Sequence, residues 1–171
     1  MKQEQAIPVF EQLYHQTFRR LSQYVLFKAG NISDTEDIVA AAYTAYYQHI
    51  VQRGHDEPAN PYAYLVRMAN HGLGRLYKER QTQISFDDDQ NHLSETLPDD
   101  PDALNHFFNQ IDSQELWLSI RRLSAAEQQV IVAHLRFDLT FREIAEQLDQ
   151  RESTVKLRYY RALERLKKIL L

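Results

Sequence analysis

Three helices are predicted in the first 80 residues from the spacing of apolar positions. Apolar residues recur every three or four positions over about 8–27, about 33–52 and about 62–79. A glycine follows the first of these segments, and a Ser-x-x-Glu capping box at Ser33 opens the second. Before the third, Asn60 is a predicted N-cap and Pro61 takes the first helical position. This half therefore has the pattern of a small helical domain.

The helical pattern is interrupted after residue 80 and then returns. From 81 to about 102 no helical period is found, and runs such as Asp87-Asp88-Asp89 indicate a flexible acidic linker. Apolar residues recur at helical spacing again from 104 to 123. Two further capping boxes, Ser124-Ala125-Ala126-Glu127 and Thr140-Phe141-Arg142-Glu143, each predict the start of another helix. A second helical domain is therefore expected after the linker.

The last two predicted helices are joined by a tight break. The first is short, and Asp149-Gln150-Arg151 separates it from a longer, basic helix. Apolar residues of the longer helix follow steps of four, three, four and three, namely Val155, Tyr159, Ala162, Leu166 and Ile169. A short helix, a tight turn and a basic second helix are the layout of a helix-turn-helix, whose second helix enters the major groove of DNA.

The opposite face of this longer helix carries the candidate DNA contacts. With Val155 to Ile169 facing inward, the outward residues are Ser153, Thr154, Lys156, Leu157, Tyr160, Arg161 and Lys168, with Arg158 on the flank. An ordinary solvated helix is the alternative interpretation. However, Leu157 and Tyr160 lie in the middle of the exposed face, where such a helix is usually polar. Leucine can pack on a thymine methyl group and arginine can reach phosphates or guanine edges, so the pattern favours DNA binding.

The residues around this turn resemble those of a known family. The matching positions are Glu143-Ile144-Ala145, Leu148, Thr154-Val155-Lys156, Arg158, Arg161-Ala162 and Leu166. They resemble the promoter-reading domain of bacterial sigma factors of the sigma-70 family, in the extracytoplasmic-function (ECF) group. Arg151 and Leu157 stand where small residues are common. The resemblance implies that the −35 promoter element is read by Arg151, Ser153, Thr154, Lys156, Leu157, Arg158, Tyr160 and Arg161.

The second predicted helix also resembles the ECF group, through Asp34-Thr35-Glu36-Asp37-Ile38-Val39-Ala40-Ala41-Ala42-Tyr43. The resemblance implies that it docks on the clamp helices of the largest subunit of RNA polymerase. The residues implied in docking are Asp34, Asp37, Val39, Ala40, Ala41 and Tyr43. Ala40-Ala41 replaces a Gln-Glu pair of the family, so two polar contacts are expected to be lost. A plain alanine-rich core helix is the alternative interpretation.

The third predicted helix resembles the family's reader of the −10 promoter element, through Asn60-Pro61-Tyr62-Ala63-Tyr64-Leu65 and Arg67-Met68-Ala69-Asn70-His71. Basic residues mixed with aromatic ones suit single-stranded DNA, because unstacked bases pack on rings while phosphates meet cations. The residues implied in −10 binding are Asn60, Tyr62, Tyr64, Arg67, Asn70 and His71. Simple packing at a helix start remains the alternative for the two tyrosines.

Charge and composition narrow the classes of function. The chain has a net charge of −4, and its excess negative charge lies in residues 81–120, which hold nine acids and no Lys or Arg. Residues 121–171 are net positive. The chain has no cysteine, its seven histidines are scattered, and Gly72-Leu73-Gly74 lacks the strand and lysine of a phosphate loop. No catalytic centre, metal site or cofactor is expected. The start of the chain lacks a signal-peptide pattern and no apolar run suits a membrane span, so we expect a cytoplasmic protein.

An all-α fold with two small helical domains is therefore expected. Residues 1–80 are predicted to bind core RNA polymerase and the −10 element, 81–110 to form the acidic flexible linker, and 111–171 to form the helix-turn-helix domain. The expected function is that of a sigma factor, with core RNA polymerase, duplex and single-stranded promoter DNA, and an anti-sigma protein as partners. Two alternatives remain: a sigma-like decoy that sequesters an anti-sigma protein, and a free-standing helix-turn-helix regulator.

Overall fold

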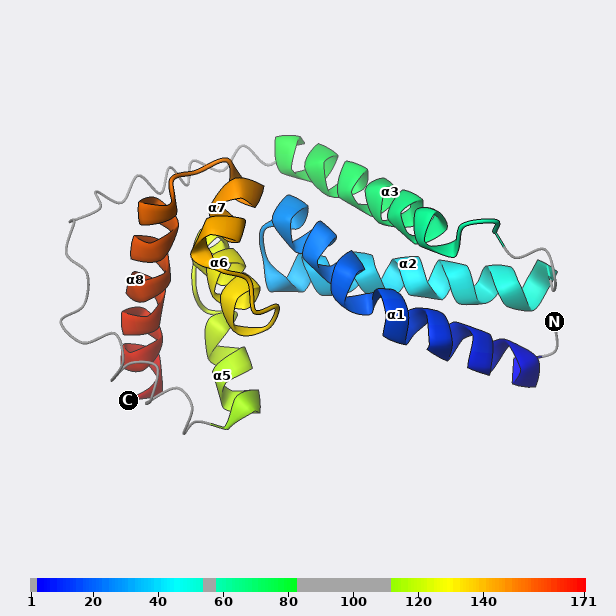
Figure 1. Cartoon of the computed structure of the whole chain (residues 1–171), viewed down its shortest axis with the longest axis horizontal. Helices are drawn as coiled ribbons and strands as arrows, with labels where there is room; N and C mark the ends of the chain where they lie inside the picture. Colours follow the sequence, from blue (N-terminus) through cyan, green and yellow to red (C-terminus); the bar gives the residue numbers. More distant parts are fainter. Residues whose placement is uncertain (1–2, 54–57, 83–111) are drawn as a thin grey trace. The chain divides into compact units, whose positions relative to one another are not determined.

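The computed structural model describes residues 3–53, 58–82 and 112–171, which are helical apart from short turns (Figure 1). Within those ranges no strand is found, and the predicted all-α class is confirmed. The predicted acidic linker and the helical pattern expected before residue 112 lie outside the described residues. The two exceptions are residues 81 and 82, where the third helix still continues.

The helices form two compact units. The first consists of α1 (Gln3–Ala29), α2 (Ile32–Arg53) from Ser33 onward, and α3 (Pro61–Thr82). The second consists of α5 (Ser113–Ile120), α6 (Ala125–Leu135), α7 (Phe141–Leu148) and α8 (Glu152–Leu170).

All three helices predicted in the first half are present, with shifted ends. Gly30 ends α1 in a left-handed conformation, with a φ of 85°, which glycine adopts without a steric penalty. Only Asn31 then separates it from α2, which begins at Ile32. Ser33 therefore lies in the first turn of α2 and is not its cap. The helix begins two residues before Asp34, which a cap at Ser33 would make the first helical residue.

The start of α3 agrees with the prediction. The Asn60 side-chain oxygen accepts a hydrogen bond from the Ala63 N–H at 3.0 Å, and the Asn60 carbonyl accepts one from Tyr64 N–H at 3.1 Å. Pro61 is the first helical residue, where its missing N–H costs no helical hydrogen bond. Asn60 is therefore the N-cap of α3.

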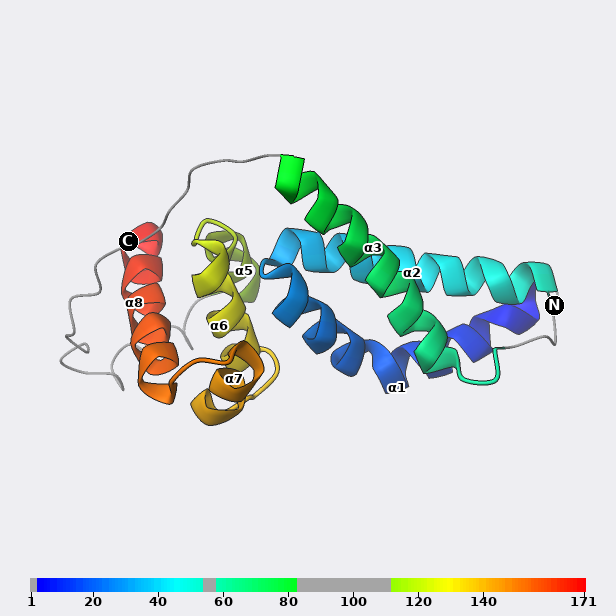
Figure 2. The ribbon, with the colours of Figure 1, turned by 90° about the horizontal axis from the view of Figure 1, so that it is seen from above.

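The first unit is held together by apolar residues from all three helices. Its buried core contains Leu21 and Val25 of α1, Tyr46 of α2, and Leu65 and Ala69 of α3, among others. Figures 1 and 2 show α3 lying along α1, and these two helices are in contact. The core therefore lies between the helices. In each helix, the face turned away from this core is exposed to solvent.

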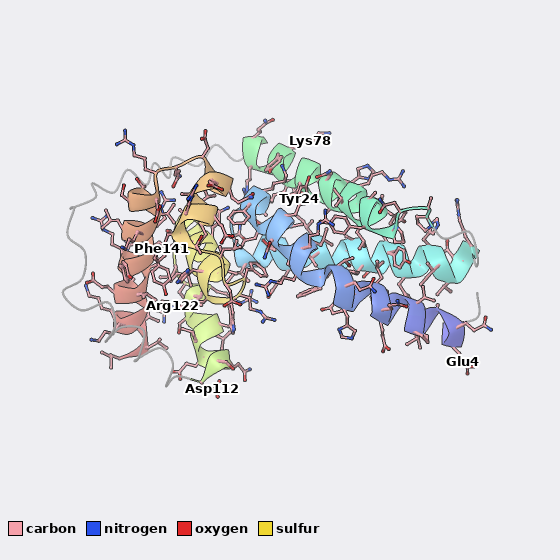
Figure 3. All side chains as sticks on the ribbon, viewed as in Figure 1. Glu4, Tyr24, Lys78, Asp112, Arg122 and Phe141 are labelled. Carbon is pink, nitrogen blue, oxygen red and sulfur yellow. The ribbon has the colours of Figure 1, made fainter. Side chains whose placement is uncertain are left out.

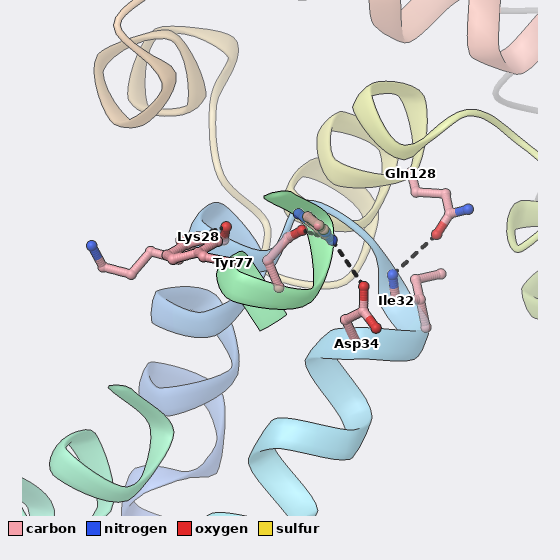
Figure 4. A network of polar contacts seen from close by, with 7 residues as sticks. Lys28, Ile32, Asp34, Tyr77 and Gln128 are labelled. Atoms are coloured by element: carbon pink, nitrogen blue, oxygen red, sulfur yellow. Dashed lines mark hydrogen bonds and ion pairs between the residues drawn. The ribbon is translucent and has the colours of Figure 1, made fainter. Parts of the chain in front are cut away.

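The corner between α1 and α2 is tied to the end of α3 by polar contacts (Figure 4). The Tyr77 hydroxyl donates to the Lys28 carbonyl at 2.9 Å. One nitrogen of Arg80 donates to the Ala29 carbonyl at 2.8 Å and to the Asp34 carboxylate at 2.8 Å. The end of α1 and the start of α2 are therefore joined through a single guanidinium group.

Gly72 lies at a close approach of α3 to α2. A Cβ placed on Gly72 would lie 3.2 Å from both Cγ atoms of Ile38, whereas a Cβ on Gly74 would meet no atom within 4 Å. Alanine in an open helical position stabilises by about 0.5–1 kcal/mol relative to glycine. We therefore expect Gly74→Ala to raise the free energy of unfolding. Gly72→Ala should be less stable than Gly74→Ala by about 1–3 kcal/mol, because the added methyl group overpacks the contact.

Urea denaturation followed by circular dichroism measures both changes. In an Ile38→Ala background the penalty at Gly72 should disappear, because both Cγ atoms are then absent. Equal stability of the two single variants would show that α2 and α3 can separate at no cost.

In the second unit, α8 contacts the three other helices. Asp112 caps α5 by accepting from Gln114 N–H at 2.7 Å. The two predicted capping boxes are confirmed, with Ser124 and Glu127 at the start of α6 and with Thr140 and Glu143 at the start of α7. The predicted inner face of α8 is also confirmed at four positions that are buried, Val155, Tyr159, Ala162 and Leu166, while Ile169 is half-buried.

Candidate nucleic-acid interface

A tight turn joins α7 to α8. Asp149 adopts a left-handed conformation with a φ of 51°, and the N–H of Gln150 donates to the Ala145 carbonyl at 3.0 Å. Arg151 then takes the N-cap position of α8 without a side-chain hydrogen bond to the helix. These contacts close the end of α7 and leave the Arg151 side chain exposed beside the first turn of α8.

The start of α7 is fixed by its capping box. The hydroxyl of Thr140 accepts from Glu143 N–H at 3.2 Å, and the Glu143 carboxylate accepts from Thr140 N–H at 2.8 Å. The backbone N–H and then the hydroxyl of Thr140 stabilise the charged carboxylate, which lowers the pKa of Glu143. The first helix of the helix-turn-helix therefore begins at a defined residue.

An aromatic cluster fixes α7 and α8 against α6. The rings of His134 and Phe141 stack with centroids 4.5 Å apart, and Tyr159 lies 4.7 Å from His134 and 5.1 Å from Phe141. Figure 3 labels Phe141 on α7. The Nδ1 atom of His134 lies 2.7 Å from the Leu139 carbonyl oxygen, in the segment before α7. One ring from each of three helices meets here, so the cluster sets the orientation of the helix-turn-helix.

Tyr160 corrects the predicted outward face of α8. The sequence placed it in the middle of the exposed face, but only 9% of its surface is exposed. Its ring lies 5.2 Å from that of Tyr159 and 6.1 Å from that of Phe141. The buried arc of α8 is wider than the helical period indicated, because α6 and α7 both pack on this helix. Tyr160 is therefore part of the packing between α7 and α8 and does not reach DNA from the centre of an exposed face.

The remaining predicted −35 residues differ in exposure. Arg151, Ser153 and Lys156 are exposed, while Thr154, Leu157, Arg158 and Arg161 are half-buried. Arg158 donates to the Gln150 side-chain oxygen at 2.9 Å, across the turn. Burial lowers the pKa of Arg158, and the nearby charge of Glu127 opposes this effect. The structure thus gathers exposed positions at the N-terminal end of α8 and orients Arg158 toward the turn.

The predicted −10 residues of α3 point to two different flanks. The guanidinium of Arg20 lies 4.1 Å from the centre of the Tyr62 ring, on the α1 side. Burial raises the pKa of Tyr62, with Arg20 opposing. The Tyr64 ring instead lies 5.2 Å from His49, on the α2 side. The two tyrosines do not form one stacking surface, because they are two residues apart on a helix.

Arg67 and Asn70, two other −10 candidates, also lie on different sides of α3. Arg67 lies 5.4 Å from the Tyr64 ring, and Asn70 accepts a hydrogen bond from the Tyr24 hydroxyl at 2.7 Å. His71 is exposed, whereas Asn60 uses its side-chain oxygen as the helix cap. The contributions of Arg20 and Tyr24 were missed from the sequence, since no motif links α1 to this surface.

The predicted polymerase-binding residues of α2 are only partly accessible. Asp37, Ala40 and Ala41 are exposed, and Asp34 forms an ion pair with Arg80 at 2.8 Å. Two predictions are wrong in their placement: the exposed fractions are 5% for Val39 and 4% for Tyr43. The Tyr43 hydroxyl lies 2.8 Å from Thr17 Oγ1, and burial raises the pKa of Tyr43. Both side chains are part of the core of the first unit and cannot contact a partner without its opening.

An open groove lies beside the exposed alanines. It has a volume of about 950 Å³, and its lining includes Asp37, Ala41 and Ala45 of α2 together with His71 and Arg75 of α3. Small side chains on α2 leave this space open, while α3 supplies its basic edge. The apolar pattern of the sequence gave no sign of the groove, because it depends on how α2 and α3 pack.

The described residues show two further absences. No group of three or more histidine, aspartate or glutamate side chains in this part of the chain is arranged to hold a metal ion. Among the described helices, none combines the length and apolar character needed to cross a bilayer.

The chain was compared with known proteins. No curated protein matches it. Residues 113–166, which extend from the start of α5 through most of α8, match the family described as sigma-70, region 4. Over this segment, which contains the helix-turn-helix, the chain is thus similar to region 4 of sigma-70 factors, a domain that binds the −35 element of promoter DNA.

Proposed function

We propose that this protein is a sigma factor of the ECF group that binds core RNA polymerase and directs promoter-specific transcription initiation. The observation that carries the proposal is the helix-turn-helix of α7 and α8, which lies inside the segment similar to sigma-70 region 4. Its capped first helix and aromatic support present a pre-organised α8, as a reader of the −35 element requires.

The first unit is assigned to the polymerase and to the −10 element. The support is the resemblance of α2 and α3 to the ECF pattern, together with the exposed positions of Asp37, Arg67 and His71. In this assignment residues 1–80 form the docking and −10 domain, 81–110 the linker and 111–171 the −35 domain. A protein that binds core RNA polymerase acts in the cytoplasm, so this function implies a cytoplasmic location.

Docking on the polymerase is assigned to the exposed face of α2. Ala40 and Ala41 are exposed there, and Ala41 borders the groove between α2 and α3. Neither side chain offers a hydrogen bond, so this surface lacks the polar contacts of the Gln-Glu pair that the family carries. Affinity should then come from apolar contact with the groove and from charges such as Asp37 at its edge.

Changing Ala40 to Gln and Ala41 to Glu should tighten binding to core polymerase. Two polar side chains on an accessible face restore hydrogen bonds, each with a net value of about 0.5–1.5 kcal/mol. Competition against a labelled reference sigma factor measures the change. Gln16→Glu on the exposed surface of α1 is the matched control, because it adds one acid away from the groove. An unchanged or weaker affinity of the double variant would place docking elsewhere.

A second candidate function is a sigma-like decoy that binds an anti-sigma protein without directing transcription. The exposed Ala40 and Ala41 favour it, because weak docking on polymerase is what a decoy requires. Core polymerase, the purified protein and a library of promoter fragments decide between the two. A sigma factor yields transcripts with defined start sites, whereas a decoy yields none and relieves inhibition when an anti-sigma protein is present.

A further inference from the structure

Arg158 of α8 is tied to the turn that precedes its own helix. Its Nη1 atom donates to the Gln150 side-chain oxygen at 2.9 Å, although the two residues are 8 positions apart. The backbone places Gln150 for this contact, because Asp149 is left-handed and the Gln150 N–H donates to the Ala145 carbonyl at 3.0 Å. The turn of the helix-turn-helix therefore holds a side chain from the second turn of α8.

The bond fixes the direction of a guanidinium that is otherwise free to adopt many conformations. An arginine side chain is long, and the rotamer freedom that it loses on meeting a ligand lowers the affinity. The bond to Gln150 removes part of this freedom before any ligand binds. A guanidinium carries several N–H groups in a planar fork, so one acceptor at Nη1 sets the plane and leaves donors for a second acceptor. Arg158 is therefore oriented in advance.

The acceptor that holds Arg158 is neutral, so the positive charge of the guanidinium is kept. An amide oxygen orients the fork without cancelling its charge, whereas a carboxylate in direct contact would cancel it. The acid whose charge acts on Arg158 is Glu127, and its Oε1 atom is already bound by Arg165 at 2.9 Å. Burial removes part of the water around Arg158 and lowers its pKa. An oriented, partly dehydrated cation suits an anionic ligand.

The position of Arg158 favours a phosphate over a base edge. At about 3.6 residues per turn, Ser153 and Leu157 point away from the core, whereas Arg158 lies half-buried on the flank of α8. The outward face of a recognition helix in the major groove meets the base edges, and its flanks lie beside the phosphate backbones. The fork of a guanidinium also matches two phosphate oxygens. The expected partner of Arg158 is therefore the DNA backbone.

We propose that Gln150 is a positioning residue for promoter binding, which holds Arg158 on a phosphate at the edge of the major groove. This inference rests on the proposed function, since it takes DNA as the ligand of α8. Neither residue reads a base. Arg158 contributes affinity for all sequences, and Gln150 acts only through Arg158.

A double-mutant cycle in the full-length protein tests this role. The probe is a fluorescein-labelled duplex that the wild-type protein selects from a random library, and fluorescence anisotropy gives the affinity. Gln150→Met keeps the length of the side chain without the acceptor, and should weaken binding by about three- to tenfold, the cost of ordering one long side chain. Arg158→Met should weaken binding further and reduce the slope of log affinity against log salt by about one. In the Arg158→Met background, Gln150→Met should have no further effect.

Base preference and stability separate this role from a structural one. On duplexes with single substitutions, Gln150→Met and Arg158→Met should each weaken binding to every sequence alike. Gln147→Met is the matched control, because it makes the same exchange at an exposed position of α7 and should leave binding unchanged. Thermal unfolding shows that each variant keeps the fold, and Arg158→Gln replaces Arg158→Met if that variant unfolds.

Two results would overturn the inference and leave the proposed function intact. Equal losses from Gln150→Met in the presence and in the absence of Arg158 would show that Gln150 acts on the turn alone. Relaxed preference at one base pair in Arg158→Met would show that Arg158 reads a base. A wild-type protein that selects no duplex from the library would instead refute DNA binding by α8, and this inference with it.

Discussion

Promoter DNA should bind more weakly by about 1–3 kcal/mol when Arg161 is replaced by Ala, provided that its contact with guanine is bidentate. Lys156→Ala should weaken binding to all sequences alike, since a flexible ammonium group meets phosphate as a point charge. The expected difference follows from the structure, in which Lys156 is exposed and Arg161 is half-buried along α8. The test is a binding isotherm for each variant on a promoter duplex and on duplexes with single substitutions in the −35 element.

Salt dependence separates the two kinds of contact. Lys156→Ala should reduce the slope of log affinity against log salt by about one, while Arg161→Ala should relax preference at one base pair. Arg122→Ala is the matched control, because it removes an exposed cation that lies outside α7 and α8. If neither Lys156→Ala nor Arg161→Ala changes DNA binding, α8 faces something other than the major groove.

The second unit should lose stability steeply in alkali through Tyr159. Burial, with a smaller effect from Tyr160, raises the pKa of Tyr159 from 10.0 to about 12. A folded-state pKa above the unfolded value means that the neutral ring stabilises the fold. This contribution is fully present below pH 10.0 and is lost as the pH rises through about 12. The pKa difference corresponds to roughly 3 kcal/mol at its full extent.

Trp117 makes the alkaline effect measurable in this unit alone. It is the only tryptophan of the chain and lies on α5, whereas Tyr43 and Tyr62, whose pKa values are also raised by burial, belong to the other unit. Denaturant unfolding followed by its fluorescence gives the free energy of unfolding at each pH. In Tyr159→Phe the decline should be much shallower, because the ring can no longer ionise. The same decline in both proteins would assign it to another group.

Local signals in the sequence predicted much of the fold. The capping boxes at Ser124 and Thr140 and the N-cap at Asn60 involve residues three positions apart, so neighbouring residue types alone determine them. The inner face of α8 was also predictable, because a helical period records which side is buried. These features need no knowledge of the partner helix.

Features that depend on packing between helices were not predictable. The period of α8 gave the centre of its buried face but not the width, and Phe141 extends that width to Tyr160. Val39 and Tyr43 match a docking motif by residue type, yet both lie in the buried core, where the Tyr43 ring meets rings of α1. In the candidate site, Tyr62 and Tyr64 share a motif but reach different helices. Each of these placements depends on residues that are distant in the sequence, and the spacing within a motif carries no information about them.

The contacts of Arg80 bear on the order in which the first unit folds. Arg80 is 51 residues from Ala29 and 46 from Asp34, so its bonds close long loops. Such contacts form late in folding, because the chain loses the entropy of closing the loop before it gains the stabilisation of the contact. The Arg80 contacts therefore hold the turn between α1 and α2 only after α3 has packed. A nascent chain that has left the ribosome only as far as α2 lacks these contacts.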